Sequence, residues 1–214
     1  MKTTIHEFDA AGMRAALDTL HRGAIIAYPT DTVYGVGGNV LDARACLKVF
    51  AAKDRPPTVP LPVLLADVAD LDLLADPVPP LARQIAAQAW PGSLTLVLPA
   101  AAHLPRELLG GRTTVAVRIP AFEPLRTLIR EFGAPLAGTS ANRHGLPNCT
   151  SAAEVLAQLD GRIPLIMDGG PSGADRPSTI LDLSGKAPQV LRQGAFDLST
   201  LEGLPELADP SSGR

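Results

Sequence analysis

The residues most able to do chemistry in this chain are cations and hydroxyl side chains that follow short apolar runs. The first such place is residues 24–38, where an apolar run passes into Pro-Thr-Asp-Thr and then a glycine-rich stretch. Pro29 cannot donate to a sheet ladder, so a buried strand is predicted to end there, followed by Thr30, Asp31 and Thr32. Ligands of open α/β sheets bind at the carboxyl ends of strands. A hydrogen-bonded polar turn remains the alternative interpretation.

Arg118 is a second candidate because it lies in a run that alternates in polarity over residues 114–119. The alternation predicts a strand with Thr114 and Arg118 on one face. An arginine in such a strand is exposed, ion-paired or bound to an anion. Lys53 and Arg55, which lie beside two prolines, suggest an anion site, and a solvated loop is the alternative there.

Common motifs for phosphate, dinucleotide and metal binding are absent from the sequence. It contains no Gly-x-x-x-x-Gly-Lys-Ser/Thr loop, no Gly-x-Gly-x-x-Gly and no His-Glu-x-x-His. The four histidines occur in unrelated contexts and the two cysteines belong to no paired motif, so neither a metal site nor a disulfide framework is predicted. Any phosphate would be held by cations from separate segments.

The composition predicts one compact domain without a membrane span. Of the 214 residues, 46% are hydrophobic and 19% are charged, which is enough for a single sizeable core. The formal net charge of −3 gives no global basic field for a polyanion such as RNA. We expect a cytoplasmic protein, because the sequence has no long apolar segment and its two cysteines suit a reducing compartment.

The elements that would position these residues alternate between helices and strands. Asp9, Asp42 and Ser151 are predicted to cap helices that begin directly after them. Apolar runs predict strands at residues 24–28, 61–66, 94–98, 114–119, 135–139, 163–167, 179–183 and 189–192. The last two strands follow one another without a helix. This order predicts an α/β (α+β) fold with a single twisted, mixed, open sheet and flanking helices.

Seven motifs, taken together, resemble those of the YrdC-like family. In the family's order they are Tyr28-Pro29-Thr30-Asp31-Thr32-Val33-Tyr34-Gly35, Lys53-x-Arg55-Pro56, Trp90-Pro91-Gly92-x-Leu94-Thr95, Val117-Arg118-Ile119-Pro120, Ser140-Ala141-Asn142, Ser178-Thr179 and Leu191-Arg192-x-Gly194. Each motif alone is weak, but their joint occurrence is specific. The resemblance implies a YrdC-like catalytic domain over residues 1–195 with a concave ligand-binding face. Residues 196–214 lack a periodic apolar face and are expected to form a loose C-terminal tail.

The resemblance also implies an activity. The family's short members are threonylcarbamoyl-AMP synthases, which use L-threonine, bicarbonate or CO2, and ATP, and release pyrophosphate. The product would supply a downstream tRNA-modifying transferase complex. Because a carbamate is already an anionic nucleophile, attack on the α-phosphorus depends on cations and positioning more than on a general base. Mg²⁺ is expected to arrive with ATP, and neither a membrane partner nor stable nucleic-acid binding is expected.

Individual roles follow from the same resemblance. The implied ATP-binding residues are Lys53, Arg55, Thr114, Ser140, Asn142, Asn148 and Arg192, and Lys53 and Arg55 would also be catalytic. The implied threonine-binding residues are Thr32, Arg118, Gly138 and Ser178, with Arg118 pairing with the carboxylate. Two positions depart from the family: Val59 stands where asparagine is common, and Leu64 stands where histidine is common. Neither side chain can supply the hydrogen bond of the residue that it replaces.

Two other functions remain open at this point. A non-catalytic RNA-binding module on the same fold would also use a cationic concave face, although the acidic total and the few aromatic residues argue against it. A carbamoyl-adenylate enzyme with a different acceptor is favoured slightly by Leu64. Longer relatives carry an additional C-terminal domain, which is not expected in a chain of this length.

Overall fold

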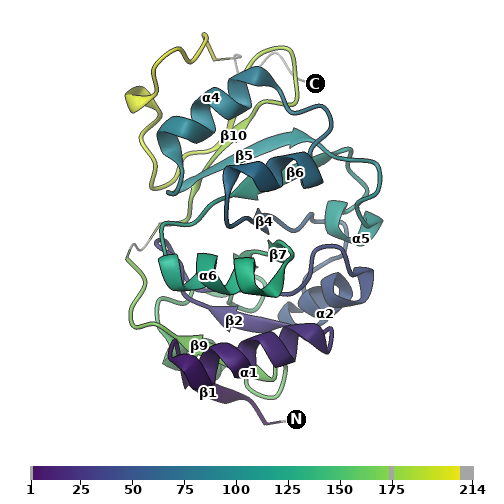
Figure 1. Ribbon diagram of the computed structural model, residues 1–214, viewed down its shortest axis with the longest axis vertical. Helices are drawn as coiled ribbons and strands as arrows, with labels where there is room; N and C mark the ends of the chain where they lie inside the picture. Colours follow the sequence, from purple (N-terminus) through teal and green to yellow (C-terminus); the bar gives the residue numbers. More distant parts are fainter. Residues whose placement is uncertain (1, 174–175, 208–214) are drawn as a thin grey trace.

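Two mixed β-sheets, rather than the single sheet expected, form the frame of the computed structural model, which describes residues 2–173 and 176–207 (Figure 1). One sheet has five strands in the order β1-β9-β2-β3-β8, and the other has six in the order β11-β10-β5-β6-β4-β7. The two sheets occupy opposite halves along the long axis of the molecule, with helices packed on them (Figure 1). The predicted α/β (α+β) class is confirmed, with the strands divided between two sheets.

The five-stranded sheet carries the first candidate segment. Its strands are β1 (Thr4–Glu7), β9 (Leu165–Asp168), β2 (Ile26–Tyr28), β3 (Gly35–Gly37) and β8 (Thr139–Ser140). The first three are parallel, and β3 is antiparallel to both of its neighbours. The predicted strand before Pro29 is confirmed as β2, and residues 29–34 form the loop that connects it to β3.

The six-stranded sheet carries Arg118 at the end of β6. Its strands are β11 (Gln189–Arg192), β10 (Thr179–Asp182), β5 (Leu94–Pro99), β6 (Thr114–Arg118), β4 (Val63–Leu64) and β7 (Leu136–Ala137). Leu64 lies directly beside Arg118 in the parallel pair of β4 and β6. The strand predicted over residues 135–139 is split, with β7 in this sheet and β8 in the other. Gly138 therefore connects the two sheets.

Helices cover the sheets, and their starts follow the predicted caps. They are α1 (Ala10–His21), α2 (Ala43–Lys53), α3 (Leu71–Leu74), α4 (Pro80–Ala89), α5 (Arg106–Leu109), α6 (Glu123–Phe132) and α7 (Ala152–Leu159), with 3-10 turns η1 (Val68–Asp70) and η2 (Leu198–Thr200). Asp9 accepts hydrogen bonds from two backbone N–H groups of α1. Asp42 and Ser151 cap α2 and α7 in the same way. All three predicted caps are confirmed.

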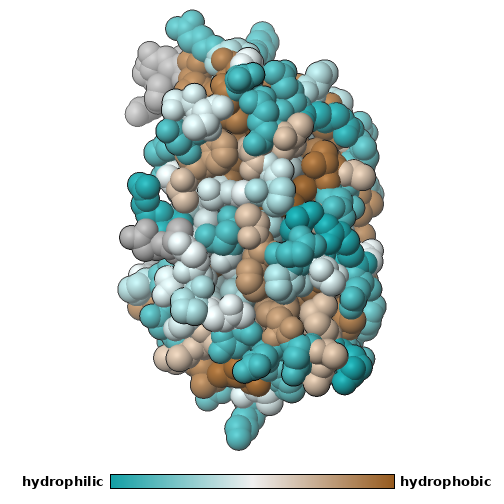
Figure 2. Space-filling model, turned by 60° about the vertical axis from the view of Figure 1, so that its left-hand side comes forward, coloured by the Kyte–Doolittle hydropathy of each residue, from teal (hydrophilic) through white to brown (hydrophobic). Residues whose placement is uncertain are grey.

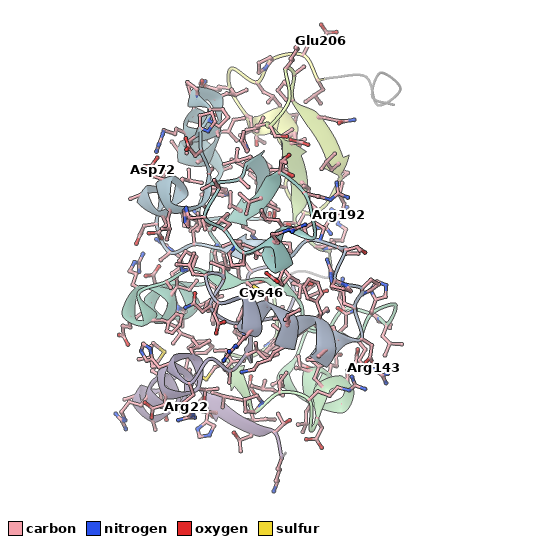
Figure 3. All side chains as sticks on the ribbon, turned by 90° about the vertical axis from the view of Figure 1, so that its right-hand side faces the viewer. Arg22, Cys46, Asp72, Arg143, Arg192 and Glu206 are labelled. Carbon is pink, nitrogen blue, oxygen red and sulfur yellow. The ribbon has the colours of Figure 1, made fainter. Side chains whose placement is uncertain are left out.

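The interior consists of two groups of buried apolar side chains. The larger group packs on both sheets and against α2, α4 and α7, and the smaller one lies under α1 and α6. Both cysteines are buried and free, and Figure 3 shows Cys46 near the middle of the molecule. On the surface, hydrophilic and hydrophobic residues are interspersed (Figure 2). In the part of the chain that the structure describes, no helix is long and apolar enough to cross a membrane.

The glycines after Tyr34 form a strand instead of the turn that their number suggests. A Cβ atom built on Gly37 would lie 1.7 Å from the carbonyl oxygen of Ala137, and one on Gly35 would lie 2.7 Å from the ring of Tyr28. Real Cβ atoms do not approach that closely, so both positions need glycine. These glycines therefore allow a close approach of neighbouring protein atoms.

The first part of the expected C-terminal tail packs against the fold. Phe196, Leu198, Leu201 and Leu204 contact the larger apolar group, so this stretch is not loose. An expectation based on the absence of a periodic face missed these contacts, because four separate apolar side chains need no periodicity to reach a core. The expected loose end at residues 208–214 lies outside the described residues.

Candidate functional site

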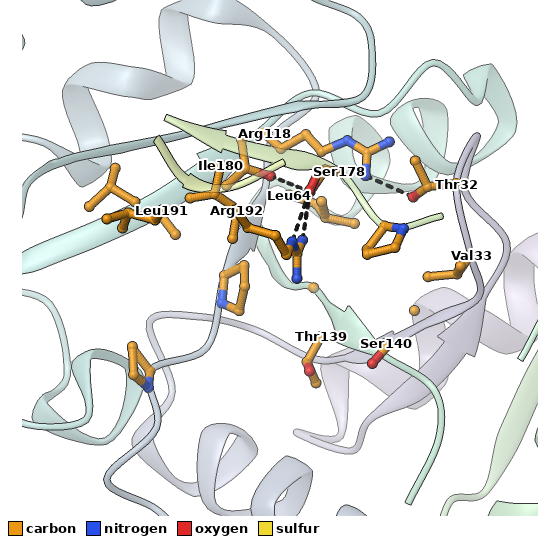
Figure 4. A pocket seen from close by; sticks show the side chains of 18 of the residues that line it. Thr32, Val33, Leu64, Arg118, Thr139, Ser140, Ser178, Ile180, Leu191 and Arg192 are labelled. Atoms are coloured by element: carbon orange, nitrogen blue, oxygen red, sulfur yellow. Dashed lines mark hydrogen bonds between the residues drawn. The ribbon is translucent and has the colours of Figure 1, made fainter. Parts of the chain in front are cut away.

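A cavity of about 450 Å³ lies between the two sheets, and most of the predicted site residues line it (Figure 4). One wall consists of alternate residues on three strands of the six-stranded sheet, namely Thr95, Val97, Thr114, Ala116, Arg118, Ile180 and Asp182. The opposite wall comes from the loop between β2 and β3 and from Thr139 and Ser140 of β8. Thr114 and Arg118 both line the cavity, which confirms that they share a face.

Arg118 is buried and held in place by three hydrogen bonds. Its Nε donates to the carbonyl oxygen of Gly92 at 2.8 Å, its Nη1 to the hydroxyl of Thr32 at 2.9 Å, and its Nη2 to Oδ1 of Asp31 at 2.6 Å. Burial lowers the pKa of Arg118, and the carboxylate of Asp31 opposes that shift. Of the alternatives left open by the sequence, the ion pair is therefore present, and the guanidinium also faces the cavity.

A directed chain of hydroxyl groups leads away from Arg118. Thr30 donates to the carbonyl oxygen of Val33 at 2.7 Å, so its hydrogen is committed. The hydroxyl oxygens of Thr30 and Thr32 are 3.0 Å apart, so Thr32 must be the donor in the hydrogen bond between them. Thr32 also accepts from Arg118 and keeps one lone pair for another donor. Its hydroxyl can accept a hydrogen bond from a ligand but has no hydrogen left to give.

A second hydroxyl pair lies on the six-stranded sheet beside Arg192. Ser178 and Thr95 are buried, and their hydroxyl oxygens are 2.8 Å apart. Arg192 donates to the carbonyl oxygen of Ser178 through Nε at 3.0 Å and through Nη2 at 2.8 Å. Figure 4 shows the Arg192 guanidinium extending past Ser178 toward the wall formed by Thr139 and Ser140. If Thr95 donates to Ser178, the serine hydrogen is available to an anionic ligand.

Three cavity arginines, Arg55, Arg112 and Arg192, lack a carboxylate partner within the described residues. Arg55 donates to the carbonyl oxygen of Pro60 at 2.9 Å and to the hydroxyl of Thr139 at 3.4 Å, and Arg192 contacts only Ser178. Burial lowers the pKa of Arg55 and of Arg192, and the nearby charge of Arg118 adds to the effect on Arg192. Arginine nevertheless stays protonated. Two partly desolvated, uncompensated positive charges are a favourable environment for an anion.

Lys53 lies beneath the cavity wall and does not line it. Its side chain is fully buried, and its Nζ donates to the carbonyl oxygens of Ser140 and of Asn142, the latter at 2.5 Å. Burial, with a smaller contribution from Arg55, lowers the pKa of Lys53 to about 7. A neutral amine still has two N–H groups, one for each carbonyl. The solvated loop considered for this residue is therefore wrong, and the lysine ties the end of α2 to the loop after β8.

Asn142 also points away from the cavity. Its Nδ2 donates to the carbonyl oxygens of Arg143 and Leu146, at 3.0 and 2.6 Å, and its buried Oδ1 has no hydrogen-bond partner among the described residues. The other residues implied by the resemblance do line the cavity: Arg55, Thr114, Ser140, Asn148 and Arg192 for ATP, and Thr32, Arg118, Gly138 and Ser178 for threonine. The structure thus brings together every predicted site residue except Lys53 and Asn142.

The two positions that depart from the family also line the cavity. Leu64 is buried between Arg118 and Gly138, where a Cβ on the glycine would lie 2.5 Å from Cγ of the leucine. Val59 is 37% exposed and Leu191 is 52% exposed, although both are cavity residues. These two apolar side chains therefore mark the opening of the cavity to solvent.

Sequence reasoning assigned no role to three residues of the site. Asp31 was recognised as polar but not as the partner of Arg118, and Thr95 was recognised only as part of a motif. The alternation on β5 places Thr95 and Val97 on one face, and that signal could have identified Thr95. Arg112 lines the cavity from the turn before β6, and no pattern in the sequence separates it from other surface arginines.

Comparisons with known proteins identify similar sequences. The Sua5/YciO/YrdC family model, described as telomere recombination, matches residues 18–194. A threonylcarbamoyl-AMP synthase of Pyrococcus abyssi is 42% identical over 190 residues, which are 89% of this chain and 56% of that protein. A threonylcarbamoyl-AMP synthase of Vibrio cholerae is 37% identical over 184 residues, which are 85% of this chain and 97% of that protein.

Solved structures with the same fold are also similar to this chain. Sua5 of P. abyssi complexed with L-threonine has a TM-score of 0.89 and 38% identity, with 97% of this chain and 62% of that chain covered. YciO of E. coli has a TM-score of 0.84 at 24% identity, which supports the fold alone. The chain spans 56% and 54% of the length of two curated relatives, from P. abyssi and Bacillus subtilis.

Proposed function

Because the chain belongs to the Sua5/YciO/YrdC family, we propose that it is a threonylcarbamoyl-AMP synthase. The proposed reaction joins L-threonine and CO2 or bicarbonate to the AMP portion of ATP and releases pyrophosphate, so it is a nucleotidyl transfer. The names of the relatives and the threonine complex of P. abyssi Sua5 support this choice. The product would pass to a tRNA-modifying transferase complex in the cytoplasm.

One observation carries the proposal: the cavity presents two kinds of cation. Arg118 is already paired with a carboxylate and is surrounded by hydroxyl groups, which suits a small anionic ligand with polar substituents. Arg55 and Arg192 have only neutral partners within the described residues, which suits a ligand that carries several negative charges. An amino acid and a nucleotide triphosphate match these two environments.

At the amino-acid end, we assign the threonine carboxylate to Arg118. The hydroxyls of Thr32 and Ser178 and the backbone of Gly138 would contact the rest of the molecule, since all three residues line the cavity together with Arg118. Figure 4 shows the Thr32 and Ser178 side chains near that of Arg118. Leu64 would offer an apolar surface to the substrate methyl group. This pocket orients the amine, because its other contacts fix both ends of a small molecule.

At the nucleotide end, Arg55 from the loop after α2 and Arg192 from β11 would bind the triphosphate. Thr114, Ser140 and Asn148 line the cavity and are the further nucleotide contacts. The position of Lys53 supports an indirect role, in which its amine holds Ser140 at the end of β8 and the loop that follows it. We assign the same indirect role to Asn142, whose amide bridges the following residues of that loop.

The chemistry then needs positioning and charge stabilisation. The neutral threonine amine captures CO2 and releases one proton to solvent, which gives a carbamate. A carbamate oxygen then attacks the α-phosphorus of ATP while the bond to pyrophosphate breaks. The carbamate is already anionic, so no side chain has to remove a proton from it in this step. Arg55 and Arg192 stabilise the charge that develops on the departing pyrophosphate. Such preorganised cations need no reorganisation at the moment of reaction.

Mg²⁺ is proposed to accompany ATP. The lining residues, as far as the structure describes the chain, include a single carboxylate, Asp182, and its Oδ1 already accepts from the backbone and hydroxyl of Ser184. Mg²⁺ keeps several waters and binds readily through phosphate oxygens. The donor set of the cavity therefore suits an ion that the nucleotide carries.

The experiment that tests the proposal is product analysis after incubation with ATP, Mg²⁺, bicarbonate and one amino acid at a time. A threonine-dependent adenylate with equimolar pyrophosphate is the expected result. Equal turnover with valine and with threonine would show that threonine is not the specific acceptor. Tight RNA binding without any adenylate formation would show that the protein is an RNA-binding module and not this enzyme.

A further inference from the structure

The carboxylate of Asp31 lies behind Arg118, outside the cavity lining. Its Oδ1 accepts from Nη2 of Arg118 at 2.6 Å and from the backbone N–H of Ala121 at 2.9 Å. The Asp31 side chain is 18% exposed, and the Arg118 side chain is 7% exposed. The ion pair is therefore largely shielded from water, and a ligand in the cavity meets the arginine and not the aspartate.

The hydrogen bonds of Arg118 leave a defined set of donors. A guanidinium has five N–H groups in a planar fork. One is used by Gly92, one by Thr32 and one by Asp31, so two remain, one on each terminal nitrogen. A carboxylate binds such a pair in a bidentate manner. Asp31 thus fixes the plane of the guanidinium while leaving one free N–H group on each terminal nitrogen.

The position of Asp31 favours binding of a ligand carboxylate to Arg118, whereas the negative charge of Asp31 disfavours it. A ligand carboxylate on Arg118 would be the second anion on one cation, and like charges a few ångströms apart in a shielded place repel. We propose that Asp31 is a positioning residue that aims the Arg118 guanidinium and weakens its attraction for the amino-acid carboxylate. The inference relies on the proposed function in one respect, that the ligand is threonine.

The two effects can be separated by two substitutions. Both hydrogen bonds of the Asp31 side chain end on Oδ1, which the amide oxygen of asparagine can replace. Asp31→Asn therefore removes the charge and keeps the orientation, whereas Asp31→Ala removes both. Asp9→Asn is the matched control, because Asp9 caps α1 through its Oδ1 and takes no part in the cavity.

The test is calorimetric titration of the full chain and these variants with L-threonine. We expect Asp31→Asn to bind threonine about tenfold tighter and Asp31→Ala to bind it about tenfold more weakly than the unchanged protein, with ATP affinity altered less than threefold. The Asp9→Asn control should bind both ligands normally. A purely structural role predicts the reverse for Asp31→Asn, because loosening of the site can only weaken binding.

Loss of the ion pair leaves a buried charge and lowers stability, so thermal unfolding with and without threonine is the second measurement. A ligand that binds only the folded state raises the unfolding midpoint even for a weakened protein, and the rise should be larger for Asp31→Asn. Equal or weaker threonine binding by Asp31→Asn, with a smaller rise, would overturn the inference. If the unchanged protein binds another amino acid instead, threonine is excluded as the ligand. The affinities of Asp31→Asn and of the unchanged protein for that amino acid are then compared, and their ratio decides the role of Asp31. No amino-acid binding at all would overturn both proposals.

Discussion

Arg118 is the residue on which the amino-acid end of the site depends. Arg118→Ala removes the cation and both free donors, so the kcat/KM for threonine should fall about a hundredfold or more. The KM for ATP should change less than threefold, since the two cations at the nucleotide end remain. Arg118→Lys should rescue poorly, because a lysine cannot reproduce three fixed contacts and a planar fork. Steady-state kinetics with each substrate varied in turn makes the measurement, and equal loss for both substrates would contradict the assignment.

Leu64 tests the apolar side of the same pocket. Leu64→His places a ring nitrogen beside Arg118 and Gly138, and one added hydrogen bond contributes about 0.5–1.5 kcal/mol. Threonine should therefore bind up to roughly tenfold tighter, while the unfolding midpoint falls because apolar contacts in the smaller core are lost. Competition among threonine, serine and valine provides the readout. Valine used as well as threonine by the unchanged protein would show that Leu64 selects a different substrate.

At the scale of elements, the end of α2 is tied to the loop after β8 by Lys53. Lysine has an ordinary pKa of 10.5 in the unfolded chain, whereas burial lowers the pKa of Lys53 to about 7 in the folded state. Between these values, unfolding takes up a proton, so this group makes the free energy of unfolding rise as the pH increases from about 7 to 10.5. Below pH 7 the buried amine is charged in both states, and the contribution to stability is at its lowest.

Lys53→Met should flatten this pH dependence. Urea unfolding at several pH values in that range measures it, and Lys48→Met on the exposed side of the same helix is the control. The slope of stability against pH should decrease for Lys53→Met alone. Adenylate formation should also fall, because Ser140 and the loop that follows it lose their anchor. A slope that is the same in both variants would show that Lys53 does not titrate in this range.

The β3 strand depends on glycine in a way that mutation can quantify. Gly37→Ala would place a methyl group 1.7 Å from the carbonyl oxygen of Ala137, and the backbones would have to separate. The expected loss is about 2–3 kcal/mol in the free energy of unfolding. Gly185→Ala is the control, since its nearest atom would lie 3.8 Å away, and its effect should stay within about 0.5 kcal/mol. Equal stabilities of the two variants in urea would contradict the packing argument.

Local patterns predicted most elements because caps and periodicity act within a few residues. Asp9, Asp42 and Ser151 cap their helices through short-range bonds that the sequence displays directly. The division into two sheets depends instead on how residues 135–139 part at Gly138, and that is decided by contacts between distant strands. The glycine strand was missed for the same reason, since the atoms that exclude a side chain at Gly37 come from a segment about a hundred residues away.

For the molecule as a whole, the nucleotide end takes one cation from the loop after α2, which contacts the first sheet, and one from the second sheet. Arg55 contacts β8 of the first sheet, and Arg192 belongs to β11 of the second. Inorganic pyrophosphate should therefore stabilise the folded protein, by about 2.7 kcal/mol at a hundred times its Kd. Arg55→Ala and Arg192→Ala should each reduce the rise in unfolding midpoint, and the double variant should abolish it. Arg143→Ala, an exposed arginine paired with Asp54, is the control.

A pyrophosphate shift that persists in the double variant would place the anion elsewhere. The sequence could nominate Arg55 and Arg192 through motif resemblance, because the types and order of the residues carry that signal. It could not exclude Lys53 from the cavity, since a lysine in a polar, proline-rich stretch gives no sign that its amine is buried. Nor could it connect Asp31 with Arg118, which are 87 residues apart in the chain.

The two buried cysteines are built-in probes of local opening in this protein. Burial raises the pKa of Cys46 to about 12 and that of Cys149 to about 11, so neither thiol reacts until the structure around it opens. Cys149 donates to the carbonyl oxygen of Ala141, and its own carbonyl accepts from the N–H of Tyr34, which joins the two loops of one cavity wall. Cys46 lies on α2, away from those loops. The rate at which each thiol is alkylated therefore reports opening of the substrate wall and of the helix separately, without any introduced label.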